Sequence, residues 1–203
     1  MTKEDAEKLV SVPILFTLFA VAFWLVTQYG PEFGIVASTL IWPALLVGTF
    51  SWFSYEVGKH RTRLVYVLKA LLLGAFLVVF DFAVENAGAI LGFWTVKQSA
   101  LHVMAVPVEV MILIFFGAAA WAMHVPEKRN WLYMLFDSLN FGFFGALGEF
   151  ILLQNQMMEY SNGWTSMHAF AGYFVTWLIL FALWWLVLNY KSSRNPKKYT
   201  YDK

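Results

Sequence analysis

Six runs of apolar residues, each long enough to cross a lipid bilayer, follow one another along this chain of 203 residues. A helix needs about 20 apolar residues to span a hydrocarbon core of about 30 Å. Hydrophobic residues make up 60% of the chain and charged residues 13%, whereas soluble domains carry about 25% charged residues. We therefore predict an all-α, polytopic membrane helix bundle with six transmembrane helices, forming a single domain over residues 1–203. The predicted spans are residues 9–29, 33–53, 65–88, 100–123, 131–154 and 167–190.

The positive charges predict how these spans are oriented, because Lys and Arg collect in short cytoplasmic loops. With six spans, Lys97 is the cation on the side away from the termini, and Lys69 lies near the start of the third span. Both termini are therefore expected in the cytoplasm, with the chain in the cell membrane. The basic segment 191–203 is expected to contact anionic membrane lipid. The cations on the side of the termini are Lys3, Lys8, Lys59, Arg61, Arg63, Lys128, Arg129, Lys191, Arg194, Lys197, Lys198 and Lys203.

Carboxylates inside the apolar spans are the main candidates for function. An ionisable side chain deep in a bilayer costs about 2.5 to 3.5 kcal/mol, so it is normally paired, bound to a ligand or used in proton transfer. In the predicted topology, Asp81 and Glu85 of the third span, Glu109 of the fourth and Glu149 of the fifth come to similar depths in the outer half of the membrane. Asp137 falls near the cytoplasmic side of the fifth span, where an interfacial position or a contact with Asn140 is expected.

Helical spacing predicts which way these carboxylates face. Residues three, four or seven apart lie on one face of a helix, so each acid can point into the bundle together with small or polar neighbours. The predicted faces are Asp81 with Glu85, Gly88 and Gly92; His102 with Glu109; and Glu149 with Gly142, Gly145 and Gln156.

Five further residues near the same outer zone are predicted to bind a substrate: Asn86, Trp94, His102, Trp164 and His168. The face of a tryptophan attracts a cation, and the amide and imidazole groups can hold polar atoms. For the two histidines, a position at the wetted edge of a loop is the alternative. The chain has no cysteine, and no HxxxH or ExxH spacing occurs within one helix. We therefore expect neither a metal site nor a cofactor.

An acid in a low-dielectric environment has a raised pKa and can stay protonated at neutral pH. Inside a membrane, a weak base within its reach is the carbon–carbon double bond of an isoprenoid, whose protonation gives a tertiary carbocation. Such a cation requires a local acid, aromatic faces or carboxylates that stabilise it, and exclusion of water. Ring closure with proton loss would make the protein a cyclase, capture by water a hydratase, and proton loss elsewhere an isomerase.

The segment DFAVENAGAILGFW carries a resemblance to a known family. Asp81 and Glu85, followed by Gly92 and Trp94, resemble the membrane carotenoid hydratases of the bacterioruberin and γ-carotene pathways, in which an acidic pair precedes a G-x-W. Asn86 stands where those proteins usually have proline. The resemblance implies a membrane enzyme that acts on isoprenoid end groups, with Trp94 lining its site.

The next segment, MAVPVEVMILIFF, resembles the P-x-E-E-x-x-x-F segment of the related heterodimeric-type lycopene cyclases. The matching positions are Pro107, Glu109 and either Phe115 or Phe116, while Val110 replaces the second carboxylate. The two resemblances together cover about 40 residues of the chain. They imply that Asp81, Glu85 and Glu109 serve as acid, base or cation stabiliser, whereas Glu149 and His168 are added by predicted depth alone.

Two other classes of function remain open from the sequence. Membrane carboxylates also form proton relays, so a proton-coupled transporter or a lipid-binding membrane protein is one alternative. Another terpenoid cyclase or isomerase built on the same acid chemistry is the second. The expected partners are a lipophilic isoprenoid substrate, membrane lipid and further subunits in a homo- or hetero-oligomer; nothing in the sequence points to nucleic acid.

Overall fold

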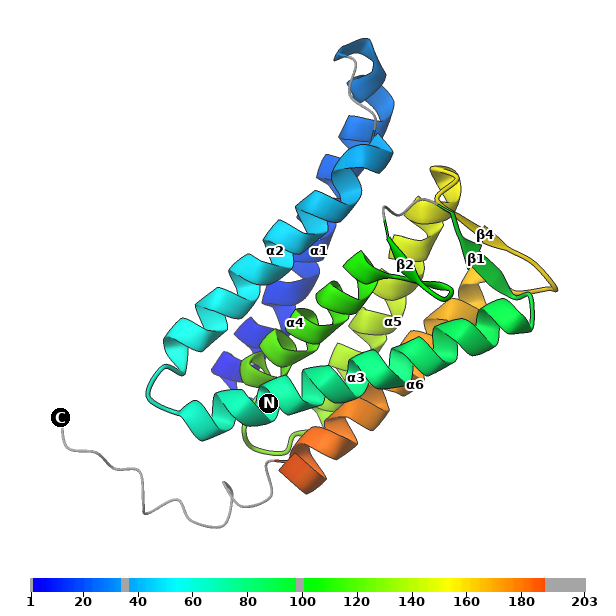
Figure 1. Cartoon of the computed structure of the whole chain (residues 1–203). Coiled ribbons are helices and arrows are strands. Elements are labelled where there is room, and N and C mark those ends of the chain that lie inside the picture. The colour runs from blue at the N-terminus through cyan, green and yellow to red at the C-terminus, as the bar shows by residue number, and fades with distance from the viewer. Residues whose placement is uncertain (1, 34–36, 98–100, 189–203) are drawn as a thin grey trace, which may run out of the picture.

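The computed structural model describes residues 2–33, 37–97 and 101–188, and the basic segment 191–203 lies outside them. Six helices occupy the regions of the six predicted spans (Figure 1). Two short helical segments, η1 (Gly30–Phe33) and the π-helical η2 (Leu183–Leu188), follow α1 and α6. The helices are α1 (Lys3–Tyr29), α2 (Ala37–Lys59), α3 (Leu64–Ile90), α4 (Val108–His124), α5 (Trp131–Gln154) and α6 (Ser166–Ala182).

Among the described residues, four helical segments are long and apolar enough to cross a membrane: α1, α3, α5 and the segment Ser166–Leu186, which extends α6 into η2. This confirms a helical membrane bundle. Helix α4 is apolar but has 17 residues, and α2 continues to Lys59, beyond the predicted end of its span at residue 53.

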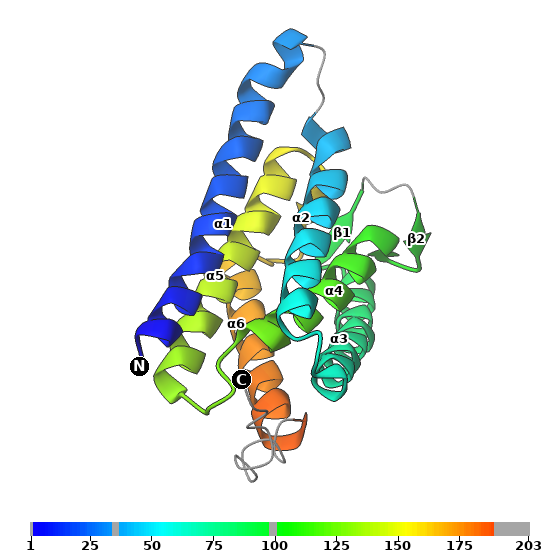
Figure 2. The same cartoon turned by 90° about the vertical axis from the view of Figure 1, so that its left-hand side faces the viewer.

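The helices pack in two connected groups. Helix α4 lies between α2 and α3, whereas α5 lies between α1 and α6 (Figures 1 and 2). Fully buried Trp121 of α4 meets Phe181 of α6 edge-on, with 4.7 Å between the ring centroids. Trp177 of α6 stacks on Phe141 of α5 at 3.9 Å. The contact of Trp121 with Phe181 joins the two groups in the buried core, whereas the stack of Trp177 on Phe141 lies within the second group.

The beginnings of α1 and α5 and the end of α6 meet at one end of the bundle, called here the terminal end. Asn130 caps α5 by accepting the backbone N–H of Tyr133 at 3.2 Å. Its side-chain amide donates to Asp5 in the first turn of α1 at 3.1 Å. Arg129 donates to the backbone carbonyl of Trp185 at 3.2 Å, which fixes the end of α6 nearby.

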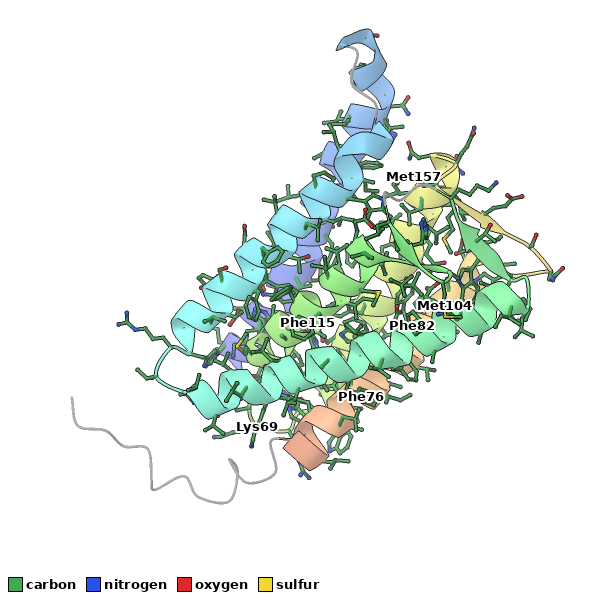
Figure 3. All side chains as sticks on the ribbon, viewed as in Figure 1. Lys69, Phe76, Phe82, Met104, Phe115 and Met157 are labelled. Atoms are coloured by element: carbon green, nitrogen blue, oxygen red, sulfur yellow. The ribbon has the colours of Figure 1, made fainter. Side chains whose placement is uncertain are left out.

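The opposite end, called here the ribbon end, contains two short antiparallel sheets. Strand β1 (Trp94–Val96) pairs with β4 (Met158–Tyr160), and β2 (His102–Val103) pairs with β3 (Val106–Pro107). Figure 3 labels Met157 at this end, just before β4, and Lys69 toward the terminal end of α3.

The structure of the ribbon end corrects three predictions. The fourth span was predicted to be helical from residue 100, but α4 begins at Val108, because Pro107 has an extended backbone and no N–H to donate. His102 lies on a strand and therefore does not share a helix face with Glu109. Gly92 and Gln156 lie beyond the ends of their helices with φ of 70° and 56°. Neither residue therefore lies on the helix face that was predicted for it.

The ion pair between Arg63 and Glu127 predicts a small pH dependence of stability at the terminal end. The two side chains are partly exposed and hydrogen-bonded, and the Arg63 guanidinium holds the pKa of the Glu127 carboxyl below its ordinary value of 4.5. At pH values above 4.5, the pair therefore stabilises the fold by about 0 to 1 kcal/mol. This contribution is lost as the pH falls through the lowered pKa of Glu127. In Glu127→Gln, the midpoint of thermal unfolding should lose this part of its pH dependence, with the more exposed Glu7→Gln as the control.

Candidate functional site

The β1–β4 ribbon holds carboxylates from two different helices. Its register sets Trp94 directly opposite Tyr160. The indole Nε1 of Trp94 donates to Oε2 of Glu85 on α3 at 2.6 Å, and the hydroxyl of Tyr160 donates to Glu149 on α5. Because cross-strand partners lie on the same face of a sheet, the two donors point to the same side. The ribbon thus brings Glu85 and Glu149 into one cluster.

Asp81 completes this cluster, called here the acid cluster: Asp81, Glu85 and Glu149. Asp81 lies one helical turn before Glu85, and its charge interacts with both Glu85 and Glu149. All three side chains are half-buried. Tyr173 of α6 forms a second hydrogen bond to Glu149. Lys97, at the end of the ribbon, pairs with exposed Glu159 rather than with these acids.

Two glycines leave room for the aromatic donors. A Cβ atom on Gly88 of α3 would lie 2.0 Å from the Trp94 ring, and one on Gly145 of α5 would lie 2.5 Å from the Tyr173 ring. Any larger residue would therefore move the ring that reaches the carboxylate. The sequence places these glycines one turn after Glu85 and one turn before Glu149, respectively.

Replacing Gly88 with alanine should displace Trp94 and break its hydrogen bond to Glu85. Overpacking of this kind typically costs about 1 to 3 kcal/mol. The measurement is thermal unfolding in detergent micelles, with Gly48→Ala as the matched control, because a Cβ at Gly48 meets no atom within 4 Å. Equal stability of the two variants would contradict the packing of Trp94 against α3.

A layer of stacked rings covers the acid cluster. Trp164 lies 4.6 Å from Trp94 and 5.2 Å from His168, measured between ring centroids. The Nε1 of Trp164 is buried and has no hydrogen-bond partner among the residues that the structure describes. His168 is exposed, and its Nδ1 accepts the backbone N–H of Thr165 at 3.2 Å, which caps α6. Trp94 and Trp164 thus lie at the site, and His168 lies at its edge.

The remaining predicted residues are Asn86, His102 and Glu109, on α3, the β2–β3 hairpin and α4. The side chain of Asn86 is structural: its oxygen accepts the N–H of Ala105 at 3.1 Å, which fixes the β2–β3 hairpin against α3. His102 is exposed on that hairpin. Glu109 is half-buried in the first turn of α4, next to Val110.

A cavity of about 230 Å³ lies against the acid cluster. Its walls come from α1, α2, α4, α5 and α6, and they are mostly apolar and aromatic. Glu149 and Tyr173 stand in its wall and join it to the cluster. A larger hollow of about 440 Å³ between α1 and α5 has an apolar lining except for Thr17 and Asn140.

A second polar cluster lies at the terminal end and was not predicted. Fully buried Glu56 pairs with His124, with 2.8 Å between Oε1 and Nδ1, and Nε2 of His124 lies 3.3 Å from the hydroxyl of Ser11. Both predicted spans ended before these residues, so their burial was overlooked. Asp137 is also buried and accepts Nε1–H of Trp121 at 2.7 Å. Its hydrogen-bond partner Trp121 was not predicted, and its position at the cytoplasmic interface stays a prediction.

Tyr160 and Tyr173 were also missed at the acid cluster. The signal for Tyr173 was its position five residues after His168 on a helix already predicted to reach the site. Tyr160 gave no comparable signal, because strand pairing across 66 residues brings it to Trp94. Within the described ranges, no group of three or more His, Cys, Asp or Glu residues is arranged to hold a metal ion.

The acid cluster can hold and exchange protons beside an apolar cavity. Comparison of the chain with protein-family models, with curated proteins and with solved structures finds no match.

Proposed function

We propose that the protein is a membrane enzyme that protonates a double bond of a carotenoid or other isoprenoid chain and acts as a hydratase or cyclase. The observation that carries this proposal is the convergence of Asp81, Glu85 and Glu149 under aromatic side chains, next to an apolar cavity. Carboxylates close together in an apolar environment share protons, so the cluster can supply an acid and a base at once.

The surroundings supply what a carbocation requires. Trp94 and Trp164 bring two indole rings to the carboxylates, and Trp94 reaches Glu85 through its N–H edge. The remaining carboxylates provide negative charge once one of them has given up its proton. The mostly apolar lining of the cavity excludes water, except for a molecule that would add to the cation in a hydratase.

The same proposal includes the orientation of the bundle. Six spans would place the ribbon end on the outer side of the cell membrane and both termini in the cytoplasm. In support, Lys8, Arg63 and Arg129 lie at the terminal end, where their contacts join α1, the α2–α3 turn and the α4–α5 loop. Protease protection or charged-reagent labelling of tags at the two ends would test this orientation.

Co-expression in a bacterial host that makes lycopene tests the proposed reaction. The intact protein should convert lycopene, or another acyclic carotenoid, to a hydroxylated or cyclised product that separates by chromatography. The mass distinguishes the outcomes, because hydration adds one water whereas cyclisation leaves the mass unchanged. Unchanged pigment across several acyclic carotenoids would remove the carotenoid version of the proposal.

The buried terminal-end cluster favours a second candidate, a proton-coupled transporter. Titratable groups lie near both ends of the bundle. Asp137 and Glu149 are twelve residues apart on α5, which corresponds to about 18 Å along the helix. Phe141, stacked on Trp177, lies between them and offers no polar atom for proton transfer. We therefore favour the enzyme. Proton flux across liposomes driven by a solute gradient would instead support transport.

A further inference from the structure

Glu149 differs from the other acids in its contact with the cavity. It stands in the wall together with Tyr173, whereas Asp81 and Glu85 belong to α3, from which no residue lines the cavity in the described part of the chain. Resting on the proposed function, we propose that Glu149 is the acid that protonates the substrate and that the cavity holds one end of a long isoprenoid chain. Glu109, which the resemblance implied as an acid, base or cation stabiliser, is not assigned the proton donation here.

The size and lining of the cavity favour an end group. At about 230 Å³ it falls below the roughly 300 to 1,000 Å³ of pockets that enclose a whole small ligand. Phe16 of α1 stacks on Phe144 of α5 at 5.3 Å, and both rings line the cavity with Trp42 of α2. A positive charge that develops beside Glu149 would therefore meet aromatic faces.

The proton transfer balances without a cofactor. The carboxyl proton of Glu149 passes to one carbon of the double bond, and the π electron pair forms the new C–H bond. The other carbon becomes cationic, and Glu149 becomes a carboxylate that accepts hydrogen bonds from Tyr160 and Tyr173. In a hydratase, the oxygen of a water then bonds to the cation and its released proton returns to Glu149. In a cyclase, a second double bond attacks the cation, and a neighbouring carbon loses its proton to a carboxylate.

Tyr160 and Tyr173 act as positioning residues for this acid. Both donate to Glu149, from the ribbon and from α6, and so fix the direction of its carboxyl group. Removing either hydroxyl should lower the turnover number more than it changes KM, because the carboxyl group would lose orientation while the cavity keeps its apolar lining. A residue with a merely structural role would not produce this split.

The test compares two pairs of matched variants in membranes that contain the full chain. Glu149→Gln and Glu159→Gln each replace one carboxyl by an amide of similar shape, and Glu159 is exposed and paired with Lys97. Gly148→Leu and Gly48→Leu each add the same side chain at a helical position where a Cβ meets no atom within 4 Å, but Gly148 lines the cavity and Gly48 does not. Conversion of acyclic polyprenyl substrates is measured, together with labelling by a polyprenyl chain that carries a photoreactive diazirine at its end.

We expect Glu149→Gln to lose at least about 100-fold in conversion while it is still labelled, and Glu159→Gln to retain most of its conversion. Gly148→Leu should lose both labelling and conversion, and Gly48→Leu should keep both. In the wild-type protein, the label should be found in the peptides that contain Phe16 and Phe144.

Several results would overturn the assignment. Wild-type conversion by Glu149→Gln would exclude Glu149 as the donor, and labelling unchanged in Gly148→Leu would exclude the cavity as the substrate site. Equal labelling by a phospholipid with a diazirine-bearing acyl chain would show an ordinary lipid groove. In each of these cases an active wild-type protein leaves the proposed function standing. A wild-type protein that converts no acyclic isoprenoid overturns the proposed function and this assignment together.

Discussion

Replacing Glu56 with alanine is expected to lower the free energy of unfolding by about 3 to 5 kcal/mol. The carboxylate is fully buried between helices and pairs with His124 of α4 and Lys59 of its own helix, at 2.8 and 3.4 Å. The alanine variant would leave the imidazole without its carboxylate partner and a cavity in place of the side chain. Because Nε2 of His124 also contacts α1 at Lys8 and Ser11, the loss would loosen three helices at once.

Thermal unfolding in detergent micelles measures this effect, with the fraction of folded protein followed by size-exclusion chromatography after heating. Glu7→Ala is the control, because Glu7 is exposed and its pair with Lys3 spans 3.8 Å at the surface. The double variant Glu56→Ala with His124→Ala should be more stable than the sum of the single losses predicts, because neither partner is left alone. Additive losses would show that the two side chains do not act as a pair.

The regular part of the fold could be predicted because hydropathy reports on helices in a membrane directly. Every backbone polar group in a bilayer core must be satisfied within its own segment, so a long apolar run leaves few alternatives to a helix. Helix α5 shows this well, since its observed bounds, Trp131–Gln154, coincide with the predicted span.

The same rule fails where the backbone leaves the helical pattern. The apolar sequence from Leu101 to Val106 reads as a span but folds as part of a hairpin, which Pro107 and the amide of Asn86 fix in place. Hydropathy also places span ends too early when a charged residue follows, as with Glu56. That residue belongs to α2 and is buried by neighbours that are distant in the sequence.

At the acid cluster, helical spacing was sufficient for the pair on α3, and predicted depth was sufficient to add Glu149. Neither helical spacing nor predicted depth could identify Tyr160, the hydrogen-bond donor on the ribbon. Tyr160 reaches Glu149 through the pairing of β1 with β4, and strand pairing depends on tertiary contacts rather than on local spacing. The residue type gave no help, because tyrosines are frequent near membrane interfaces for other reasons.

Replacing Asp81 with asparagine is expected to lower conversion of an isoprenoid substrate by about 100- to 1,000-fold. Among the described residues, Asp81 has no hydrogen bond comparable to those of Glu85 and Glu149, and its charge interacts with both. An amide has nearly the same shape but carries neither a negative charge nor an exchangeable carboxyl proton. The cation formed beside Glu149 would therefore lose a stabilising charge, and the cluster would lose one of its proton acceptors.

The measurement is product formed per amount of folded protein in the lycopene-producing host, with Glu159→Gln as the control at the same end of the molecule. Glu159 is exposed and pairs with Lys97, so its replacement should leave conversion unchanged. If the acids share protons as one unit, Asp81→Asn combined with Glu85→Gln should cost little more than the worse single variant. Independent, multiplicative losses would mean that each carboxylate acts on the substrate separately. Full activity of Asp81→Asn would remove Asp81 from the reaction and leave Glu85 as the partner of Glu149.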